Sequence, residues 1–401
     1  MGFLFKIYAA INNRILFDAE KEHPSVQEQK KFLHSFAEPG NVTERSFYKY
    51  QCLMFYSYSK GQRIFMNFIS FLALGLLILL YRARGIRHDK FMKGFQPRDI
   101  LLRKATKRIP ITDIFPEALN ACYPEAVDYD GVSYSEIFIT GDAFSRFWKA
   151  VKAHPFYFHY HMVVLLRLAQ ASFLLCKYAP KCITTYVCER EFADPILTEY
   201  FESHQVQYHG FMHGDYLYSI EQAFMYFSKY WLWGEHYRTL FKSMRCAFDT
   251  EIYTPKKWAG IVKPRKSMED YDYYATYYFS NEKKESIEIL KDAFLKLKGR
   301  GHKCKVRPHP RFSNVNMIKD IFGKEFEVED TSKIAIEESL ECSYITIALI
   351  STVLTQAYYS GKKVVIDDIS DPKVYEQLRE KEYILIDKAD MLFSELLERG
   401  D

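Results

Sequence analysis

The residues best suited to chemistry lie in two short segments of the C-terminal third of the chain. His309 stands between Pro308 and Pro310, and the hydroxyls of Ser351 and Thr352 follow about forty residues later. The prolines fix the backbone on both sides of the imidazole. The Ser-Thr pair lies between an apolar strand-like run and a helical pattern, so its hydroxyls and the N–H groups of a helix N-terminus form an anion site. We therefore predict that both segments bind a phosphate.

Two cations belong to the same histidine turn, because Arg307 and Arg311 flank it. With Ser351 and Thr352 they form the predicted nucleotide- and phosphate-binding set, and His309 is the predicted donor of a proton or hydrogen bond to a phosphate oxygen. The alternative for His309 is a structural turn with a solvated imidazole. The alternative for the hydroxyl pair is an ordinary helix N-cap.

A base for the acceptor hydroxyl is expected where a predicted strand over residues 206–212 ends in His213-Gly214-Asp215. Ligand-binding groups of parallel α/β sheets lie at the carboxyl ends of strands. Asp215 and His213 are both candidates, and the alternative is a capped turn into the next helix. Glu189, at the end of a neighbouring predicted strand, is a third candidate, with a capping or salt-bridged carboxylate as its alternative.

The sequence predicts neither a metal nor a cofactor. Asp367-Asp368 is similar to a metal-binding carboxylate pair, but the sequence supplies no obvious third ligand. The eight cysteines form neither a CxxC pair nor a zinc-type cluster, which predicts a reduced, cytosolic protein. The net charge of +4 and the absence of basic runs interleaved with stacking aromatics exclude nucleic acid as the expected partner.

The elements that must position these residues follow from the chain in order. A length of 401 residues with 17% aromatics predicts two or three folded domains. Residues 1–98 read as a helical segment. Residues 99–250 and 271–401 alternate predicted strands and helices, which indicates parallel βαβ units and an α/β fold of two Rossmann-like domains facing a cleft. The predicted strands include residues 135–140, 344–348, 363–366 and 383–386, and the predicted helices include residues 315–322 and 353–359. Residues 251–270 are rich in Pro, Gly and Lys and predict a linker.

The most hydrophobic stretch is residues 64–81, and a basic cluster follows it over residues 82–93. Three interpretations remain open: a membrane span with its basic flank on the cytoplasmic side, a helix lying on anionic lipid, or a buried core helix. The first two make the inner membrane surface a partner and associate residues 1–98 with the membrane.

The Arg307-Pro308-His309-Pro310 segment and the Ser351-Thr352 pair resemble the His-Pro and Ser-Ser/Ser-Thr motifs of bacterial sialyltransferases and polysialyltransferases. The resemblance covers roughly residues 270–370. It implies a GT-B fold, a CMP-sugar donor, inversion at the anomeric carbon and no metal. It also implies that His309 assists departure of the phosphate, while Ser351 and Thr352 bind it.

The N-terminal half departs from that family, because the acidic Asp/Glu-Asp/Glu-Gly motif that carries the base there is missing. Met212-His213-Gly214-Asp215 stands at a comparable strand end. Its His-Gly pair resembles the CDP-glycerol glycerophosphotransferases of teichoic acid synthesis, which implies His213 as the base. Both families act at the cytoplasmic membrane face on lipid-linked or nascent glycans.

We therefore predict a GT-B-like glycosyltransferase that moves sialic acid or a related sugar from a CMP-sugar, its co-substrate, to a glycan or lipid-linked glycan of the cell surface (capsule, O-antigen or lipooligosaccharide). Asp215 or His213 would deprotonate the acceptor, and His309 would offset charge on the leaving phosphate. The alternatives are phosphoglycerol or phosphoribitol transfer from a CDP donor, and a non-catalytic membrane-associated scaffold with the same fold. The expected location is the cytoplasmic face of the cell membrane.

Overall fold

The computed structural model describes the whole chain except residues 1, 17–21, 105–114, 187–189, 256–266 and 400–401. Two compact units make up the fold. The N-terminal unit comprises Met1–His213 and Tyr218–Tyr253, and the C-terminal unit comprises Gly214–Leu217 and Thr254–Asp401. The four residues Gly214–Leu217 thus belong to the C-terminal unit, although the residues on both sides of them belong to the N-terminal unit.

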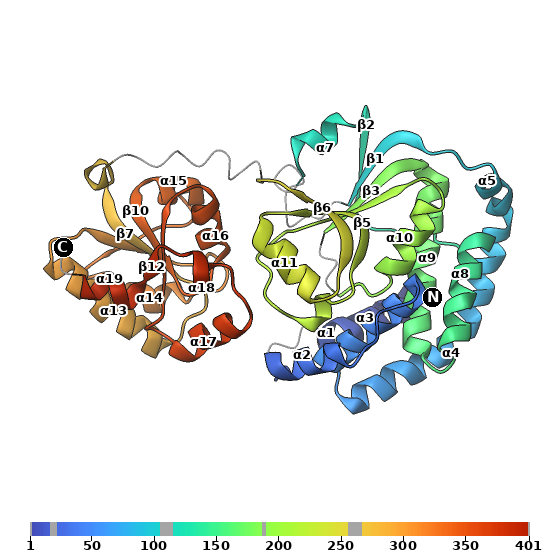
Figure 1. The fold of residues 1–401 in the computed structure, drawn as a ribbon, viewed down its shortest axis with the longest axis horizontal. Helices are drawn as coiled ribbons and strands as arrows, with labels where there is room; N and C mark the ends of the chain where they lie inside the picture. Colours follow the sequence, from blue (N-terminus) through green and yellow to red (C-terminus); the bar gives the residue numbers. More distant parts are fainter. Residues whose placement is uncertain (1, 17–21, 105–114, 187–189, 256–266, 400–401) are drawn as a thin grey trace. The chain divides into compact units, whose positions relative to one another are not determined.

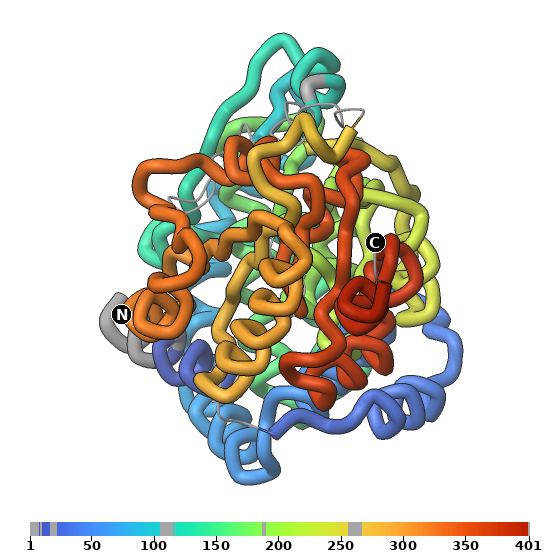
Figure 2. The backbone as a smooth tube through the Cα atoms, turned by 90° about the vertical axis from the view of Figure 1, so that its left-hand side faces the viewer, coloured from blue at the N-terminus to red at the C-terminus, as the bar shows by residue number. Residues whose placement is uncertain are grey.

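A run of helices begins the N-terminal unit and appears in shades of blue in Figures 1 and 2. Their bounds are α1 (Gly2–Leu16), α2 (Val26–His34), α3 (Val42–Ser57), α4 (Lys60–Gly85), η1 (Ile86–His88) and α5 (Asp89–Lys93). Side chains cap several of them: Ser25 and Ser59 form capping boxes at α2 and α4, and Asn41 caps α3. These helices and the first sheet belong to the same unit.

The first sheet is parallel, with the order β2-β1-β3-β4-β5-β6. Its strands are β1 (Arg98–Lys104), β2 (Glu125–Tyr129), β3 (Pro180–Tyr186), β4 (Gln207–Phe211), β5 (Tyr226–Leu232) and β6 (Ala247–Ile252). The helices and turns between them are α7 (Glu117–Ala121), α8 (Gly141–Ala153), α9 (Phe158–Tyr178), α10 (Asp194–Glu202), η2 (Ile220–Gln222) and α11 (Glu235–Ser243).

The second sheet is also parallel, with the order β12-β11-β10-β7-β8-β9. Its strands are β7 (Tyr273–Tyr278), β8 (Cys304–Arg307), β9 (Glu327–Val328), β10 (Ser343–Ala348), β11 (Lys363–Ile366) and β12 (Met391–Leu392). Its helices are η3 (Met268–Asp270), α13 (Lys284–Gly299), α14 (Val315–Phe322), α15 (Ile336–Glu341), α16 (Thr352–Tyr359), α17 (Pro372–Glu380), α18 (Leu385–Lys388) and α19 (Phe393–Glu398).

The apolar core of the C-terminal unit explains why these segments are strands and helices. β8 is buried at every position and β10 at all but one, as expected for parallel strands that are covered on both faces. On α13, Ile287, Leu290, Phe294 and Leu297 recur at helical spacing and enter the core beside Tyr277. These two parallel sheets confirm the predicted GT-B-like fold class, in which a helical N-terminal segment precedes two Rossmann-like units in the sequence.

Two predicted strands are wrong. Residues 135–140 form no strand; they run beside α4, where Ile139 is buried and its N–H donates to the Tyr81 carbonyl (3.1 Å). Residues 383–386 instead lead into the short helix α18. Burial rather than sheet pairing accounts for both apolar runs, because Ile137, Phe138, Tyr383 and Leu385 are all core residues.

Candidate functional site

The strand order of the C-terminal unit locates its ligand-binding edge. Numbered within the sheet, β7 to β12 are arranged 3-2-1-4-5-6, the order of dinucleotide-binding folds. The order reverses between β7 and β10, which pair directly. In such sheets, ligands bind outside the carboxyl ends of the strands that flank this switch point. The loops that follow β7 and β10 are therefore the first place to look for a site.

Ser351 and Thr352 lie at this switch point, between β10 and α16. Ser351 is the N-cap of α16, with its Oγ accepting the Val353 N–H (3.2 Å). Ser351 is half-buried, and Thr352, the first helical residue, is exposed. Because the first N–H groups of a helix have no partner within it, this end of α16 presents donors and the positive end of the helix dipole. The sequence-predicted hydroxyl pair thus occupies a suitable anion position.

His309 lies on the loop that follows β8, the strand next to β7. β8 and β10 therefore stand on either side of β7, so their ends are roughly 9.5 Å apart. A tight turn shapes the loop: the His309 N–H donates to Ser313 Oγ (2.7 Å), and this hydroxyl donates to the Ser280 carbonyl (2.8 Å) after β7. The two predicted phosphate-binding segments share one edge of one sheet, with the end of β7 between them.

The His309 ring is held in one tautomer. Its Nδ1 accepts the backbone N–H groups of Arg311 (3.0 Å) and Phe312 (3.3 Å), so the proton of the neutral ring is on Nε2. The Phe312 ring stacks on the imidazole with centroids 4.5 Å apart. Burial, and then the Arg311 cation, lower the pKa of His309 from its ordinary value. The ring is therefore built to donate one hydrogen bond from Nε2 rather than to carry a charge.

Arg307, predicted to bind phosphate, is engaged elsewhere. Its guanidinium donates to Glu329 (2.6 Å) and to the Ile334 carbonyl (3.0 Å), and its side chain is 8% exposed. Lys305 pairs with the same carboxylate (2.6 Å), so two cations of β8 share one buried anion that follows β9. We remove Arg307 from the proposed phosphate site, because its charge is already paired inside the unit. Arg311 remains in it, since it is exposed on the histidine turn.

The structure brings Asp215 to the same helix as Ser351. Thr355 Oγ1, on α16, donates to Asp215 Oδ2 (2.6 Å), and Ser351 and Thr355 are four residues apart, which puts them on one helix face. This contact lies within the C-terminal unit, which includes Gly214–Leu217. His213, on the N-terminal unit, lies beside Tyr186 at the end of β3 (ring centroids 6.3 Å apart). Of the two candidate bases, Asp215 is the one held against α16.

The switch point of the first sheet lies between β1 and β3, and the loops that follow these strands begin with residues outside the described set. Glu189 is one of these residues. Close to the ends of β1 and β3 is a cavity of about 150 Å³, lined by Lys104, Tyr129, Arg167, Thr185 and Glu191 among others. An ion pair between Arg167 and Glu191 forms part of its wall. The cavity, whose lining combines apolar side chains with this ion pair, lies at the edge where the N-terminal unit would hold a ligand.

The sequence reasoning missed one carboxyl group at the switch point. Glu282 follows β7, and its carboxylate accepts the Ser280 N–H (2.7 Å). Burial raises the pKa of Glu282 to about 7, against the lowering effect of backbone hydrogen bonds. A carboxyl that titrates near neutral pH can donate or accept a hydrogen bond. A glutamate just beyond a predicted strand was the only available signal, and it is a weak one.

Asp367 and Asp368 have structural partners. Asp367 is fully buried and accepts hydrogen bonds from the Tyr277 hydroxyl (2.7 Å) and from the Ile369 and Ser370 N–H groups (3.0 Å each). Asp368 accepts from the Ser394 hydroxyl (2.6 Å). Within the described residues, no group of three or more His, Cys, Asp or Glu side chains could hold a metal ion.

Comparison with known proteins gives distant structural similarities. No protein family model matches the chain, and no curated protein matches it in sequence. Solved structures that resemble it include the wall teichoic acid polymerase TagF, at 11% identity and a TM-score of 0.41, covering 84% of this chain and 89% of that one. UDP-GlcNAc 2-epimerase from Neisseria meningitidis bound to UDP-GlcNAc matches at 9% and 0.37, covering 69% and 85%. The glycotransferase of kitacinnamycin matches at 11% and 0.35, covering 76% and 92%. Similarity this distant carries no weight for function.

Proposed function

We propose that this protein is a glycosyltransferase that uses a nucleotide-activated sugar. The observation that carries the proposal is the grouping at one edge of the C-terminal sheet: the Ser351-capped helix at the switch point and the donor-only imidazole of His309 two strands away. A phosphate group between them would accept hydrogen bonds from the α16 N-terminus and from His309 Nε2. That geometry supports donor binding in this unit.

The chemistry would be a direct displacement at the sugar carbon. Asp215 would accept the proton of the acceptor hydroxyl as its oxygen forms a bond to that carbon. The bond between the carbon and the phosphate oxygen would break, and the phosphate would depart with the electron pair. His309 and α16 would stabilise the negative charge that develops on the phosphate. Arg311, exposed on the same turn, would add positive charge. These interactions strengthen as the charge grows, which is the condition for acceleration.

The donor we propose is a CMP-activated nonulosonate such as sialic acid, and the acceptor is a glycan or lipid-linked glycan of the cell surface. Support comes from the His-Pro and Ser-Thr segments of the resemblance, which lie on the same sheet edge. The cavity in the N-terminal unit, with its Arg167–Glu191 wall, is the proposed place for part of the acceptor. None of the proposed steps uses a metal or a cofactor.

A second candidate is transfer of phosphoglycerol or phosphoribitol from a CDP donor, with His213 as the base. One observation favours it: the Asp215 carboxylate already accepts the Thr355 hydroxyl, so one of its two oxygens is engaged. The imidazole of His213 lies two residues away in sequence, at the edge of the first sheet. Under this alternative, the attacked atom is a phosphorus and not a sugar carbon.

Calorimetric titration with CMP and with CDP-glycerol tests the proposal. We expect CMP to bind and Ser351→Ala to weaken it about tenfold or more, because the variant loses a hydroxyl and loosens the end of α16. Ser25→Ala removes an equivalent N-cap from α2 and is the matched control, which should bind CMP like the wild type. Tight binding of CDP-glycerol without CMP would favour the second candidate. If neither nucleotide binds, the protein is not a transferase of this kind.

A further inference from the structure

Helix α4 has two different apolar faces. One packs into the N-terminal unit through Met66, Ser70, Leu74, Leu77, Tyr81 and Gly85. The opposite face is exposed and almost wholly hydrophobic, with side chains 48–71% exposed: Ile64, Phe65, Phe68, Phe71, Leu72, Leu76 and Leu79. We call these seven residues the α4 stripe. At roughly 150–250 Å² per large apolar side chain, the stripe exposes on the order of 700 Å², above the ~300–600 Å² of the largest patch on a typical monomer.

The stripe is straight and uninterrupted. At 100° per residue its members lie within one side of the helix, and no charged residue stands between Arg63 and Arg82. Phe156, which is 76% exposed, lies at one side of it, because its carbonyl accepts a hydrogen bond from Asn67 of α4 (3.0 Å). The helix has 26 residues, which gives a length of ~39 Å.

Polar contacts along its length fix α4 on the folded unit. Asn67 Oδ1 accepts the His159 N–H (3.1 Å), and the Tyr81 carbonyl accepts the Ile139 N–H (3.1 Å). At Gly85 the helix meets the chain so closely that a Cβ would lie 1.8 Å from the Ile139 carbonyl oxygen. The helix is therefore a built-in part of the unit and not a separate segment.

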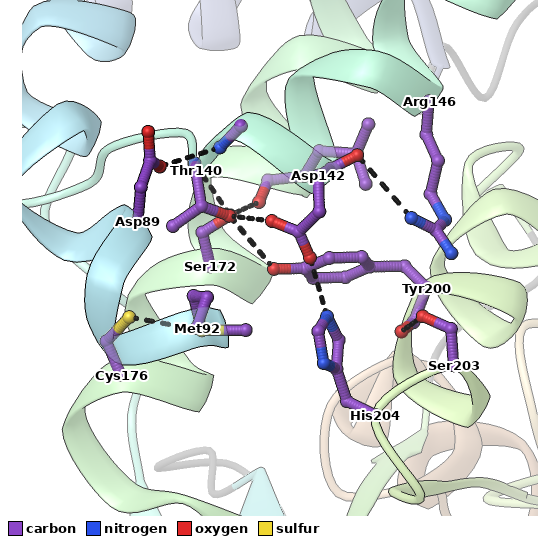
Figure 3. Close-up of polar contacts among 12 residues, drawn as sticks. Asp89, Met92, Thr140, Asp142, Arg146, Ser172, Cys176, Tyr200, Ser203 and His204 are labelled. Atoms are coloured by element: carbon purple, nitrogen blue, oxygen red, sulfur yellow. Dashed lines mark hydrogen bonds and ion pairs between the residues drawn. The ribbon is translucent and has the colours of Figure 1, made fainter. Parts of the chain in front are cut away.

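A polar network holds the residues that follow α4. Asp89 pairs with Arg82 (2.5 Å) and accepts the Gly141 N–H (2.8 Å) at the start of α8. In Figure 3, Asp142 of the same turn is bonded to Thr140 (2.7 Å) and to His204 (2.6 Å). Although burial opposes ionisation, these hydrogen bonds hold the pKa of Asp142 down, at about 2. The network keeps the basic segment after α4 in a defined position.

Positive charge gathers at both ends of the α4 stripe. Residues 60–93 contain seven Lys and Arg residues and a single acidic residue, Asp89. Lys60 and Arg63 precede the stripe, and the other five follow it: Arg82, Arg84, Arg87, Lys90 and Lys93. Of these, Lys60, Arg87, Lys90 and Lys93 are exposed. The apolar stripe therefore has a cationic patch at each end.

We propose that the α4 stripe docks the protein on the surface of an anionic lipid bilayer, with the helix axis in the plane of the membrane. The stripe would enter the boundary between headgroups and acyl chains, and the cations at both ends would contact anionic headgroups. The charge pattern selects this occupant. If a second copy paired stripe to stripe, the basic ends would meet basic ends in either orientation, and like charges would repel.

The packing of α4 on its unit also distinguishes a helix that lies on the membrane from a helix that crosses it. Two described helical regions, Lys60–Lys93 and α9, are long and apolar enough to cross a membrane. The apolar window of α9 is 72% buried, so α9 is a core helix, whereas that of Lys60–Lys93 is 28% buried. A spanning helix needs lipid or protein around its whole apolar length. With one face packed on the folded N-terminal unit, α4 offers only the other face to lipid.

Vesicle pelleting tests the proposal directly. We expect the purified full chain to pellet with phosphatidylcholine vesicles that contain phosphatidylglycerol, more weakly with phosphatidylcholine alone, and less at high salt. The double variant Leu72→Asp/Leu76→Asp should lower the partition coefficient at least a hundredfold. Arg87→Gln/Lys90→Gln should lower it about tenfold on anionic vesicles only. The matched control is Ile289→Asp/Leu295→Asp, on the exposed face of α13, which should pellet like the wild type.

Circular dichroism and the melting temperature report whether the variants fold, and the exposure of Leu72 and Leu76 (64% and 61%) predicts that they do. A folded stripe variant that pellets like the wild type would overturn the proposal. The proposal would also be overturned if light scattering showed that the wild type is a dimer, that the wild type does not bind vesicles, and that the stripe variant is a monomer. Alkaline carbonate should release the bound protein, and resistance to it would contradict the in-plane geometry. Binding of CMP is measured separately, so either proposal can fail alone.

Discussion

If His309 acts as the structure indicates, replacing it will show the loss of a neutral hydrogen-bond donor. The change is His309→Ala, compared with His309→Gln. Alanine removes the Nε2–H donor, while glutamine carries an amide N–H at a similar distance from the backbone and cannot titrate. A hydrogen bond to a charged oxygen contributes roughly 1.5–3 kcal/mol, and loss of one such donor costs roughly 10²–10³ in rate. We expect His309→Ala to lower kcat/KM about a hundredfold and His309→Gln to recover part of it.

The pH profile distinguishes this role from that of a proton donor. Nδ1 accepts two backbone N–H groups, at 3.0 and 3.3 Å, so a proton placed there would face two donors. The pKa of His309 is lowered by burial and by Arg311, so the ring stays neutral until the pH falls below its ordinary value of 6.5. The contribution of His309 to kcat/KM should be flat above that pH and decline on acidification. Arg311→Gln should move this decline toward higher pH.

The assay is initial-rate transfer from the CMP-sugar to an acceptor glycan between pH 5 and 9, with wild type, both His309 variants and Arg311→Gln. His309→Gln should lack the acid decline that His309 causes, since an amide does not titrate. Activity that instead rises on acidification and falls above neutral pH, with this dependence lost in His309→Gln, would refute the reasoning. The ring would then act as an imidazolium acid, and the backbone hydrogen bonds to Nδ1 would have to break.

Two further predictions concern stability. Glu329→Gln leaves Lys305 and its neighbouring guanidinium buried without an anion, so the free energy of unfolding from urea titration should fall by about 3–5 kcal/mol; a small loss would mean that water reaches these cations. Burial lowers the pKa of His159 to about 4. As the pH drops from 7 to 5, His159 therefore binds a proton in the unfolded chain but not in the folded chain. His159 alone should account for about 2 kcal/mol of the fall in stability over that range, and a His159→Phe variant with the same slope as the wild type would contradict this.

The C-terminal half could be predicted well from the sequence because its signals are local. The bounds of α14 and β11 match the predicted ones, and β10 and α16 begin within one residue of them. Short apolar strands that alternate with amphipathic helices allow few other readings. Because strand ends in such a fold share one edge, the sequence also predicted that His309 and Ser351 belong to one site.

The predictions from sequence were wrong or incomplete where tertiary contacts decide the local structure or the partner of a side chain. β1 and β2 went unpredicted, and the apolar residues 135–140 looked like a strand because burial against α4 gives the same pattern as sheet pairing. Arg307 looked like a phosphate ligand, since its partner Glu329 lies on a separate strand end that no local pattern connects to it. The engagement of Asp215 by Thr355 spans 140 residues and is equally invisible in sequence.

The fixed tautomer of His309 sets a rule for ligands and inhibitors. A ring whose Nδ1 is occupied by backbone N–H groups can only donate from Nε2, so the group it meets must offer a hydrogen-bond acceptor. In an analogue in which an amino group replaces the phosphate oxygen facing the ring, the N–H donors of that group would face the Nε2–H donor of His309, and no hydrogen bond would form. A sulfonate or phosphonate in the same place would keep an oxygen acceptor. Donor mimics for this protein should therefore keep every oxygen on that side of the anion.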